Sequence, residues 1–467
     1  MVYVSVYFYV FVLLSVFVYY IVPLKRRWIV LLFADFLFYI VFLKKGFIIF
    51  VITILLSFLL AKVISIKKST SKKVTLIISI IFVILPWFLL KYLGVSNILA
   101  PIGISFYTLQ IIAYLIDVYR EGTIAQSNFL KYLLFVSFFP QIIQGPIPRY
   151  NQLEPQLLEG NKFVEQKFVK GLFYILGGFF LKFMIADKAG IIVGAVFDEY
   201  TIYAGTYIWV ASILYSIQLY TDFLACTTLS RGVALLFGIE IIENFKRPYF
   251  SSSVKDFWKR WHISLSMWLR DYIYIPLGGN RKGRARQITN LFITFLISGF
   301  WHGSGIKFIV WGMVHALYQL IEIICDGILR KTRLKDNYII QRLSPLKYVI
   351  TFFMVDIAWV IFRADTLSGG KNMLVSMFTV HNPWILFNDR LYSLGLDQKD
   401  FFVLIIAILF LFMIEYMQEK GLVVWEYYIN QNIIMRWFVF IGIMVIVMVF
   451  GTYGYGYNAQ DFIYGGF

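Results

Sequence analysis

The chain has 467 residues, of which 60% are apolar and only 15% are charged, and its mean hydropathy is +0.75. Soluble domains have about half apolar and about a quarter charged residues, so this composition excludes an assembly of soluble domains and indicates an integral membrane protein. The formal net charge is +17. The basic residues stand in short loops between apolar segments, which favours cytoplasmic loop charge over nucleic-acid binding.

Four apolar segments long enough to cross a bilayer occupy the first hundred residues, at 2–22, 28–43, 47–66 and 74–93. The basic cluster at residues 25–27 follows the first segment, and the basic loop at 67–73 follows the third. Two predicted spans lie between these clusters, so both clusters face the same side of the membrane. Their positive charge predicts that this side is the cytoplasm, which places the N-terminus outside. The first segment has no basic residues before it, so we expect a retained span instead of a cleaved signal peptide.

The next part of the chain alternates apolar spans with interruptions. Residues 102–118 form a span, and residues 132–144 are apolar but contain Pro140, so we expect a helix end or a re-entrant bend there. The polar residues 151–170 predict a surface helix. Further spans are predicted at 171–186 and 208–220. The segment 221–242 contains Asp222, Arg231 and Glu240, which is too much charge for a simple lipid-facing helix.

Apolar segments at 306–325, 348–362, 401–417 and 437–450 bring the predicted total to about eleven transmembrane helices. The sequence therefore predicts an all-α polytopic membrane protein with one integral-membrane domain over residues 1–467 and a motif-rich core at about 100–320. Cys226 and Cys325 lie in apolar surroundings and form no metal-ligand spacing, so neither a metal site nor a disulfide framework is indicated.

Residues 257–315 contain three of the four histidines. In the first part of this stretch, the large apolar residues recur at helical spacing and share one face: Trp258, Trp261, Leu265, Trp268, Tyr272 and Ile275. This pattern predicts one amphipathic helix with aromatic anchors. Such a helix is too short to span a bilayer and suits an interface or a re-entrant element. Asp271 beside Arg270 predicts a local ion pair.

His302 ends an apolar segment and is followed by Gly303 and Gly305. A histidine in such a place is costly. A neutral imidazole with a pKa near about 6.5 can take a proton and return it, as a general base does. The alternative is a buried histidine bonded to a carbonyl at a helix break. His262 could orient substrate or be structural, whereas His315 lies mid-span and predicts a packed core residue. His381 lies in a polar loop and is given no role.

The basic residues Arg281, Lys282, Arg284 and Arg286 follow a Gly-Gly-Asn turn. They could be cytoplasmic loop charge alone, or they could hold the phosphates of a nucleotide-bearing donor. Motifs for a P-loop, a serine nucleophile elbow or a zinc protease helix are absent from the sequence. It also lacks an inverted hydropathy repeat and a run of intramembrane carboxylates, which a transporter would favour.

Several motifs together closely resemble the membrane-bound O-acyltransferase (MBOAT) family, and more narrowly its bacterial alginate O-acetyltransferase-like branch. They are FWKRWHISLS at 257–266, LRDY at 269–272, PLGGN at 276–280 and FWHG at 300–303. GISFY at 103–107, DVYR at 117–120 and QGPIPR at 144–149 also look like that branch. The resemblance extends over about residues 1–450.

The resemblance implies helices, including short re-entrant or interfacial ones, around a central tunnel. The family's catalytic histidine corresponds to His302 and its second motif histidine to His262. It also implies acetyl-CoA as the acyl donor with no bound cofactor or metal, so Arg281, Lys282 and Arg284 are candidates for binding the donor phosphates. The candidates for lining the tunnel are Trp261, Trp301, Ser266 and Asp271.

Proteins of this kind move an acyl group across a bacterial plasma membrane, often to an extracytoplasmic partner acyltransferase that modifies a polysaccharide. The resemblance thus implies a protein that is surrounded by membrane lipid and does not bind nucleic acid. A sister branch takes D-alanine from an acyl carrier protein and attaches it to teichoic acid. The stretch 276–281 favours the acetylating branch. A transporter or lipid scramblase without acyl chemistry is the third alternative.

Overall fold

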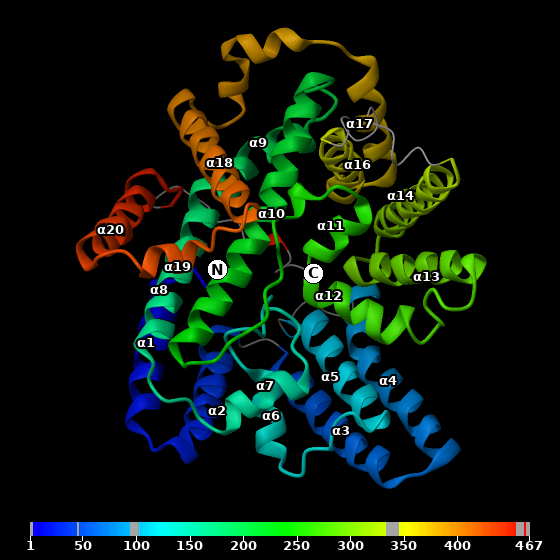
Figure 1. Cartoon of the computed structure of the whole chain (residues 1–467), viewed down its shortest axis with the longest axis vertical. Coiled ribbons are helices and arrows are strands. Elements are labelled where there is room, and N and C mark those ends of the chain that lie inside the picture. Colours follow the sequence, from blue (N-terminus) through cyan, green and yellow to red (C-terminus); the bar gives the residue numbers. More distant parts are fainter. Residues whose placement is uncertain are drawn as a thin grey trace. The chain divides into compact units, whose positions relative to one another are not determined.

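The computed structural model describes residues 3–43, 46–93, 101, 103–332, 345–453 and 462–463. Within these residues all the regular elements are helical (Figure 1). In these ranges seven helices are long and apolar enough to cross a membrane. The prediction of a helical, multi-pass membrane protein is confirmed, whereas the number of about eleven spans stays a prediction.

By contacts the chain divides into two compact units. The first comprises Met1–Gly178, Cys226–Glu243 and Asp461–Phe467, and the second comprises Phe179–Ala225 and Asn244–Gln460. The single domain expected over residues 1–467 stays a prediction. The two units are described separately.

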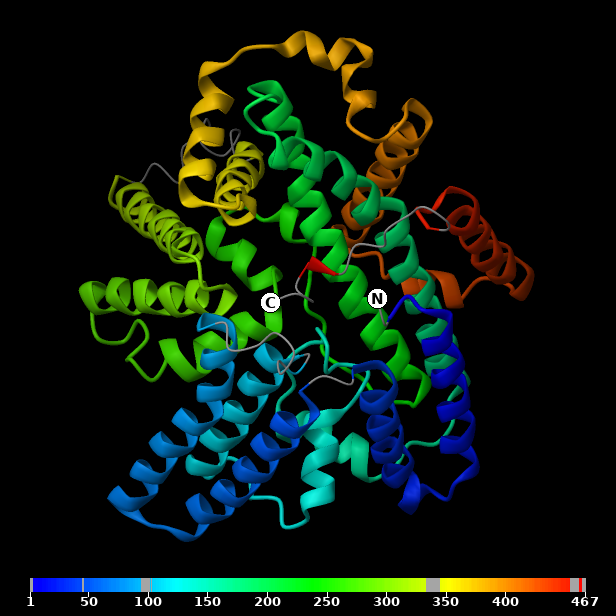
Figure 2. The same ribbon diagram turned by 180° about the vertical axis from the view of Figure 1, so that it is seen from behind.

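The first unit begins with two helices followed by three that lie side by side, α3, α4 and α5 (Figures 1 and 2). Its helices are α1 (Val6–Ile21), α2 (Arg27–Phe38), α3 (Phe47–Ile66), α4 (Ser69–Tyr92), α5 (Ile104–Tyr119), α6 (Phe129–Ser137), α7 (Tyr150–Leu158) and α8 (Glu165–Phe179). The surface helix expected at 151–170 is wrong, because α7 and α8 are separate. Gly160 lies between them with a φ of +74°, a conformation that favours glycine and ends a helix.

The predicted bend near Pro140 is present in the first unit. Helix α6 ends at Ser137, and the residues after it form buried turns up to Gln144. The Asp35 carboxylate accepts hydrogen bonds from the Ser137 hydroxyl, at 2.7 Å, and from the Phe139 amide, at 2.8 Å. The Tyr3 hydroxyl donates to the Pro140 carbonyl at 2.9 Å. These bonds supply partners that irregular backbone needs where water is absent.

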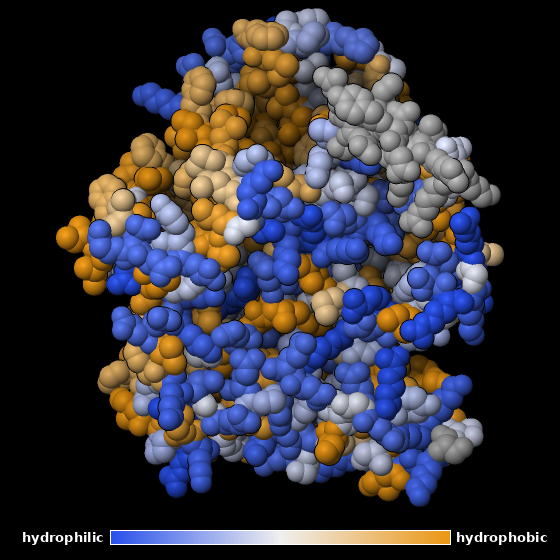
Figure 3. Space-filling model, viewed as in Figure 1, coloured by the Kyte–Doolittle hydropathy of each residue, from blue (hydrophilic) through white to orange (hydrophobic). Residues whose placement is uncertain are grey.

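The second unit contains the motif stretch. Its helices are α9 (Asp187–Asp198), α11 (Val254–Arg260), α12 (Ile263–Leu269), α13 (Arg284–His302), α14 (Ile306–Lys331), α16 (Leu346–Arg363), α17 (Leu367–Thr379), α18 (Gln398–Glu419), α19 (Val424–Ile429) and α20 (Ile433–Phe450). In the view of Figure 3 apolar side chains cover α18 and α20, and hydrophilic side chains gather over α11 and α13. The apolar cover is the surface expected of lipid-facing helices.

Helix α10 (Thr206–Leu236) is a single helix of 31 residues, and its residues up to Ala225 belong to the second unit. The sequence predicted a span that ends at residue 220 and a separate charged segment over residues 221–242. That division is wrong, because no glycine or proline stands at this point to end the helix.

The charge on α10 is explained in part by a buried ionic group. Lys182 Nζ lies 2.8 Å from Asp187 Oδ1 and 2.8 Å from Asp222 Oδ1, and all three side chains are buried. The Asp356 carboxylate accepts hydrogen bonds from Ser212, at 2.9 Å, and from Ser216, at 2.6 Å. Charged groups at such depth are expected to face protein and to be paired, as these are.

Candidate active site

The stretch expected to be one amphipathic helix is two helices that meet at His262. Helix α11 begins where Ser253 accepts a hydrogen bond from the Asp256 amide, at 3.0 Å, and ends at Arg260. His262 has a φ of +43° and a ψ of 55°, and α12 follows it. The prediction of one helix is therefore wrong.

The break is held by a segment that precedes α11 in the chain. The Ile263 amide donates to the Asn244 carbonyl at 2.9 Å, and the Ser264 amide donates to Asn244 Oδ1 at 3.0 Å. The Lys246 amide donates to the Arg260 carbonyl at 2.9 Å. These bonds satisfy backbone groups that an uninterrupted helix would have satisfied by itself.

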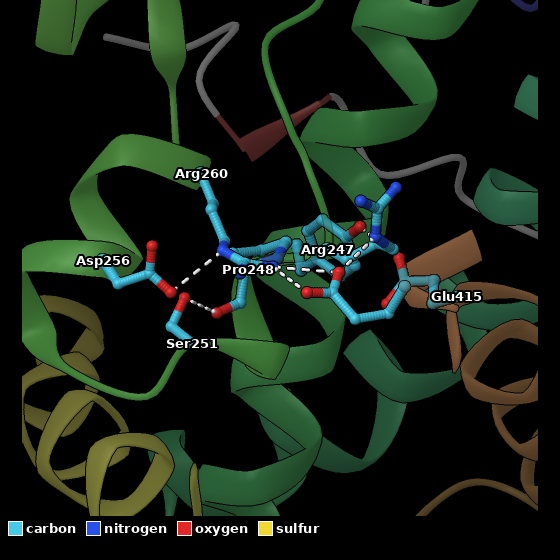
Figure 4. A network of polar contacts seen from close by, with 8 residues as sticks. Arg247, Pro248, Ser251, Asp256, Arg260 and Glu415 are labelled. Carbon is cyan, nitrogen blue, oxygen red and sulfur yellow. Dashed lines mark hydrogen bonds and ion pairs between the residues drawn. The ribbon is translucent and has the colours of Figure 1, made fainter. Parts of the chain in front are cut away.

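An ionic network ties α11 to α18 (Figure 4). The Glu419 carboxylate of α18 accepts from Arg260 Nη1 at 3.0 Å and from Arg247 Nε at 2.7 Å. Arg260 Nε also lies 3.1 Å from Asp256 Oδ2, one helical turn earlier on α11. Nearby, the Tyr220 hydroxyl donates to Glu415. The network fixes the end of α11 two residues before His262.

His262 is buried, with a relative exposure of 1%. Its ring meets the Phe223 ring edge-on at 4.8 Å and lies 6.1 Å from the Trp301 ring. Burial lowers the pKa of His262 to about 3, so the imidazole is neutral at physiological pH. Non-glycine residues with positive φ are uncommon, and histidine is among those enriched there.

His302 is the last residue of α13 and is also buried, with a relative exposure of 3%. Its ring is surrounded by the rings of Trp301 at 4.8 Å, Trp311 at 4.9 Å and Phe362 at 5.5 Å. The Trp301 ring is thus a neighbour of both imidazoles. The surroundings are aromatic and exclude water, so electrostatic interactions with a reacting group would be strong there.

Close packing of α13 on α14 fixes the position of His302. A Cβ atom added to Gly299 would lie 2.4 Å from the Phe308 carbonyl oxygen, and one added to Gly312 would lie 2.4 Å from the Phe295 carbonyl oxygen. A Cβ at Gly303 would lie 2.0 Å from the Phe308 ring. Small residues let two helices approach this closely, which explains the glycines around His302.

His315 of α14 is fully buried, as predicted for a packed core histidine. Its Nδ1 accepts a hydrogen bond from Trp258 Nε1 at 3.2 Å, and its ring lies 5.1 Å from the Trp311 ring. The three histidines of the motif stretch therefore share one aromatic core.

A pocket of about 930 Å³ lies beside this core. Five exposed cations line it: Lys255, Lys259, Arg270, Arg281 and Lys282. Its floor includes the turn at Gly278 and Gly279, whose φ values are +110° and +55°. The Asn290 amide group donates to the Gly279 carbonyl at 2.9 Å and holds this turn against α13.

One face of α13 lines the inner part of the pocket. Gln287, Leu291, Thr294, Phe295 and Ser298 line it, and their spacing places them along one side of the helix. Ser298 is buried, with a relative exposure of 1%. His302 continues the same face one turn further on. The pocket therefore leads from exposed positive charge toward the imidazole of His302.

Residues 118–362 match the profile of the membrane-bound O-acyltransferase family. The chain belongs to this family.

The curated relatives match similar shares of this MBOAT chain. A probable alginate O-acetylase of Pseudomonas putida is 40% identical over 284 residues, which are 61% of this chain and 56% of the relative. The peptidoglycan O-acetyltransferase of Helicobacter pylori is 37% identical over 307 residues, 60% of this chain and 57% of the relative. A teichoic acid D-alanyltransferase of Bacillus subtilis is 30% identical over 281 residues, 57% of this chain and 69% of the relative. The matches to the first two thus span a little over half the length of each relative.

The structure separates the three cations that the sequence grouped as donor ligands. Arg281 and Lys282 line the pocket of this MBOAT chain. Arg284 does not line it: its Nη1 lies beside Gly327 of α14, 3.8 Å from where a Cβ of that residue would stand. Lys255 and Lys259, four residues apart on α11, were missed as candidates. Their spacing of four residues places both lysines on one face of a helix and could have indicated a second group of cations. The prediction for this helix rested only on its aromatic face.

The four tunnel candidates lie in different surroundings. Ser266 lines the pocket, and its hydroxyl donates to the Trp261 carbonyl at 3.1 Å. Trp261 is a core residue stacked on Phe257 at 5.3 Å. Asp271 forms the predicted ion pair with Arg270, at 2.7 Å. The tunnel itself stays a prediction. In the described part of the chain, no group of three or more histidine, cysteine or acidic residues could hold a metal ion.

Proposed function

We propose that this protein is an O-acyltransferase that takes an acetyl group from cytoplasmic acetyl-CoA for the O-acetylation of a cell-surface polysaccharide. The observation that carries the proposal is the continuity of the pocket. It begins at exposed cations, follows one face of α13 and ends one helical turn from His302.

The outer end of the pocket suits a polyphosphate. Its cations include Arg270 and Arg281, and arginine binds phosphate oxygens through two parallel hydrogen bonds. The volume of about 930 Å³ is at the upper end for small-molecule sites. In the proposed complex the phosphates of coenzyme A lie at these cations, and the pantetheine arm follows α13 inward.

The chemistry proceeds at His302. Its neutral imidazole takes the proton of the acceptor hydroxyl while the hydroxyl oxygen attacks the thioester carbonyl carbon. The new C–O bond forms, the C–S bond breaks, and the proton passes from the imidazole to the departing sulfur. A general base of this kind contributes about 10²–10⁴-fold in rate. His262, neutral and packed near Trp301, positions the reacting groups.

The names of the relatives support the acceptor class in this proposal. Names of the relatives specify alginate and peptidoglycan as acceptors for those proteins. We infer a multi-pass protein of a bacterial plasma membrane with its N-terminus outside. It passes the acetyl group to an extracytoplasmic partner acyltransferase or to the polysaccharide directly.

The alternative function is D-alanyl transfer from an acyl carrier protein to teichoic acid. It is supported by the relative from Bacillus subtilis, which is 30% identical, against 40% for an alginate O-acetylase relative. The pocket has the volume of a small-molecule site, which favours a free nucleotide as the donor. A transporter without acyl chemistry would have no use for His302.

The testing experiment supplies purified protein in liposomes with labelled acetyl-CoA or, separately, with a D-alanyl carrier protein. Wild type is compared with His302→Ala, and His381→Ala, which changes an exposed histidine, is the matched control. We expect turnover of acetyl-CoA by wild type and the control, reduced at least 10²-fold in His302→Ala. Turnover only with the carrier protein would establish the D-alanylating function, and turnover independent of His302 would contradict acyl transfer at this site.

A further inference from the structure

Ser298 is a buried residue of the pocket, and its hydroxyl is unpaired in the part of the chain that the structure describes. It lines the inner end of the pocket with a relative exposure of 1%. Among the described residues its Oγ has no hydrogen-bond partner. A buried polar group left in this state costs about 1–3 kcal/mol, so it needs an explanation beyond packing.

The neighbouring hydroxyls of α13 behave differently. Thr289 donates to the Ala285 carbonyl at 3.1 Å, and Thr294 donates to the Asn290 carbonyl at 2.7 Å. Bonding to the carbonyl four residues earlier is the usual solution for serine and threonine inside helices. Ser298 has the same option with the Thr294 carbonyl and does not take it, so its hydroxyl remains available to a ligand in the pocket.

The position of Ser298 relative to His302 gives this hydroxyl a chemical use. Residues four apart on a helix lie on one face with Cβ atoms about 5–6 Å apart. A thioester carbonyl carbon attacked beside His302 therefore has its oxygen within reach of the Ser298 side chain. The other serine and threonine hydroxyls of the pocket, on Ser266 and Thr294, already donate to backbone carbonyls.

We propose that Ser298 donates a hydrogen bond to the thioester carbonyl oxygen of the acyl donor and stabilises the oxyanion that forms there. The inference rests on the proposed function, because it takes an acyl thioester as the occupant of the pocket. As the acceptor oxygen adds to the carbonyl carbon, the carbonyl electron pair moves to the oxygen that Ser298 holds. The pair returns as the C–S bond breaks. Ser298 keeps its own proton throughout.

The first test is steady-state kinetics with acetyl-CoA in liposomes. Ser298→Ala removes the donor, and Thr289→Val is the matched control, since it removes a hydroxyl of the same helix that is bonded to backbone and lies outside the pocket lining. Loss of one oxyanion donor reduces kcat by about 10²–10³-fold. We expect this fall in Ser298→Ala with KM for acetyl-CoA unchanged, and near wild-type kcat in Thr289→Val.

Ser298→Cys keeps the side-chain volume and leaves a weak donor. It is expected to give an intermediate kcat, and it serves as the test if the alanine variant fails to insert or fold. A raised KM with normal kcat in either variant would overturn the oxyanion role and place the hydroxyl on the pantetheine arm. Equal kcat in wild type and both variants would overturn the proposal entirely.

A second readout does not depend on turnover. Acetyl-CoA labelled with ¹³C at the carbonyl is bound to His302→Ala protein, and the infrared carbonyl band is recorded. We expect the band at lower frequency than in solution, and the shift to be lost when Ser298→Ala is added. A shift that survives the second substitution would overturn the proposal. If wild type does not use acetyl-CoA at all, the proposed function fails, which is a different result from a wild type that works and a Ser298→Ala variant equal to it.

Discussion

The two ends of the pocket are built on different physical principles. The outer end presents five exposed cations, among them Arg281 and Lys282, on the turn and helices around the entrance. The inner end presents Phe295 and Ser298, both buried, and then His302 in its aromatic surroundings. Positive charge in contact with water attracts a ligand, whereas a dry, packed end positions one.

This difference has consequences for substitution. Exposed charges are screened by salt over about 8–10 Å at physiological ionic strength, so each contributes modestly. Groups in a water-excluded site interact strongly and depend on one another. We therefore expect changes at the outer end to act on donor affinity and to depend on salt. Changes at the inner end should act on the rate or on folding.

The largest effect is expected where α13 crosses α14. In Gly299→Ala the new Cβ would lie 2.4 Å from the Phe308 carbonyl oxygen, a backbone atom that cannot easily move. Overpacking of this kind costs about 1–3 kcal/mol, and the displaced helix should move His302. We expect a lower unfolding temperature in detergent and a large loss of kcat.

Gly327→Ala on α14 is the matched control, because a Cβ there meets only the flexible end of Arg284 at 3.8 Å. It should leave both the unfolding temperature and kcat near those of wild type. If Gly299→Ala behaves like this control, close packing does not position His302.

A smaller effect is expected at the outer end. Charge reversal in the double variant Arg281→Glu with Lys282→Glu removes two pocket cations and adds two repelling charges. Hydrogen bonds to charged groups contribute about 1.5–3 kcal/mol each, so KM for acetyl-CoA should rise by at least about 10-fold with little change in kcat. The rise should shrink as salt is added to the assay.

Arg284→Glu makes the same kind of charge change outside the pocket lining. We expect it to alter KM much less than the double variant does. An equal rise in KM for both would mean that general surface charge attracts the donor, and that the pocket cations do not bind its phosphates directly.

An effect confined to acidic pH concerns His262. Its pKa is about 3 in the folded protein and about 6.5 in an unfolded chain. Above about pH 6.5 the imidazole is neutral in both states. Below it the unfolded state binds a proton that the folded state refuses, so folded stability falls by up to about 1.4 kcal/mol per pH unit. His262→Asn should reduce the fall in unfolding temperature between pH 6.5 and 4.

For the control of this prediction, His381→Asn changes an exposed histidine and should leave the pH dependence of unfolding as in wild type. Parallel curves for wild type and His262→Asn would contradict a neutral, buried imidazole at residue 262.

Much of the fold follows from hydropathy. Helix α3 has the predicted bounds of residues 47–66, and the end of α13 at His302 is where the apolar segment stops. Residues of the 257–315 stretch also come together around one pocket and its aromatic core. These features are local, because the length of an apolar run and the glycines after it are properties of the segment itself.

Other features depend on residues distant in sequence. The break at His262 is held by hydrogen bonds that Asn244 accepts from the amides of Ile263 and Ser264, and no glycine or proline marks it. The outward placement of Arg284 depends on α14, although it stands only two residues from Lys282. Ser298, unlike Thr294, makes no hydrogen bond to the carbonyl four residues earlier. Residue type and spacing are the same in either arrangement, so only packing decides among them.

The left-handed backbone at His262 also limits which residues can replace it. Glycine, asparagine and aspartate tolerate a φ of +43°, whereas a β-branched residue at this position would strain the backbone between α11 and α12. An alanine substitution would therefore combine the loss of the imidazole with a cost to the backbone, and its defect would overstate the part played by the ring. Asparagine keeps the turn and removes only the imidazole. A scan of all replacements at this position should rank them by backbone tolerance first and by side-chain chemistry second.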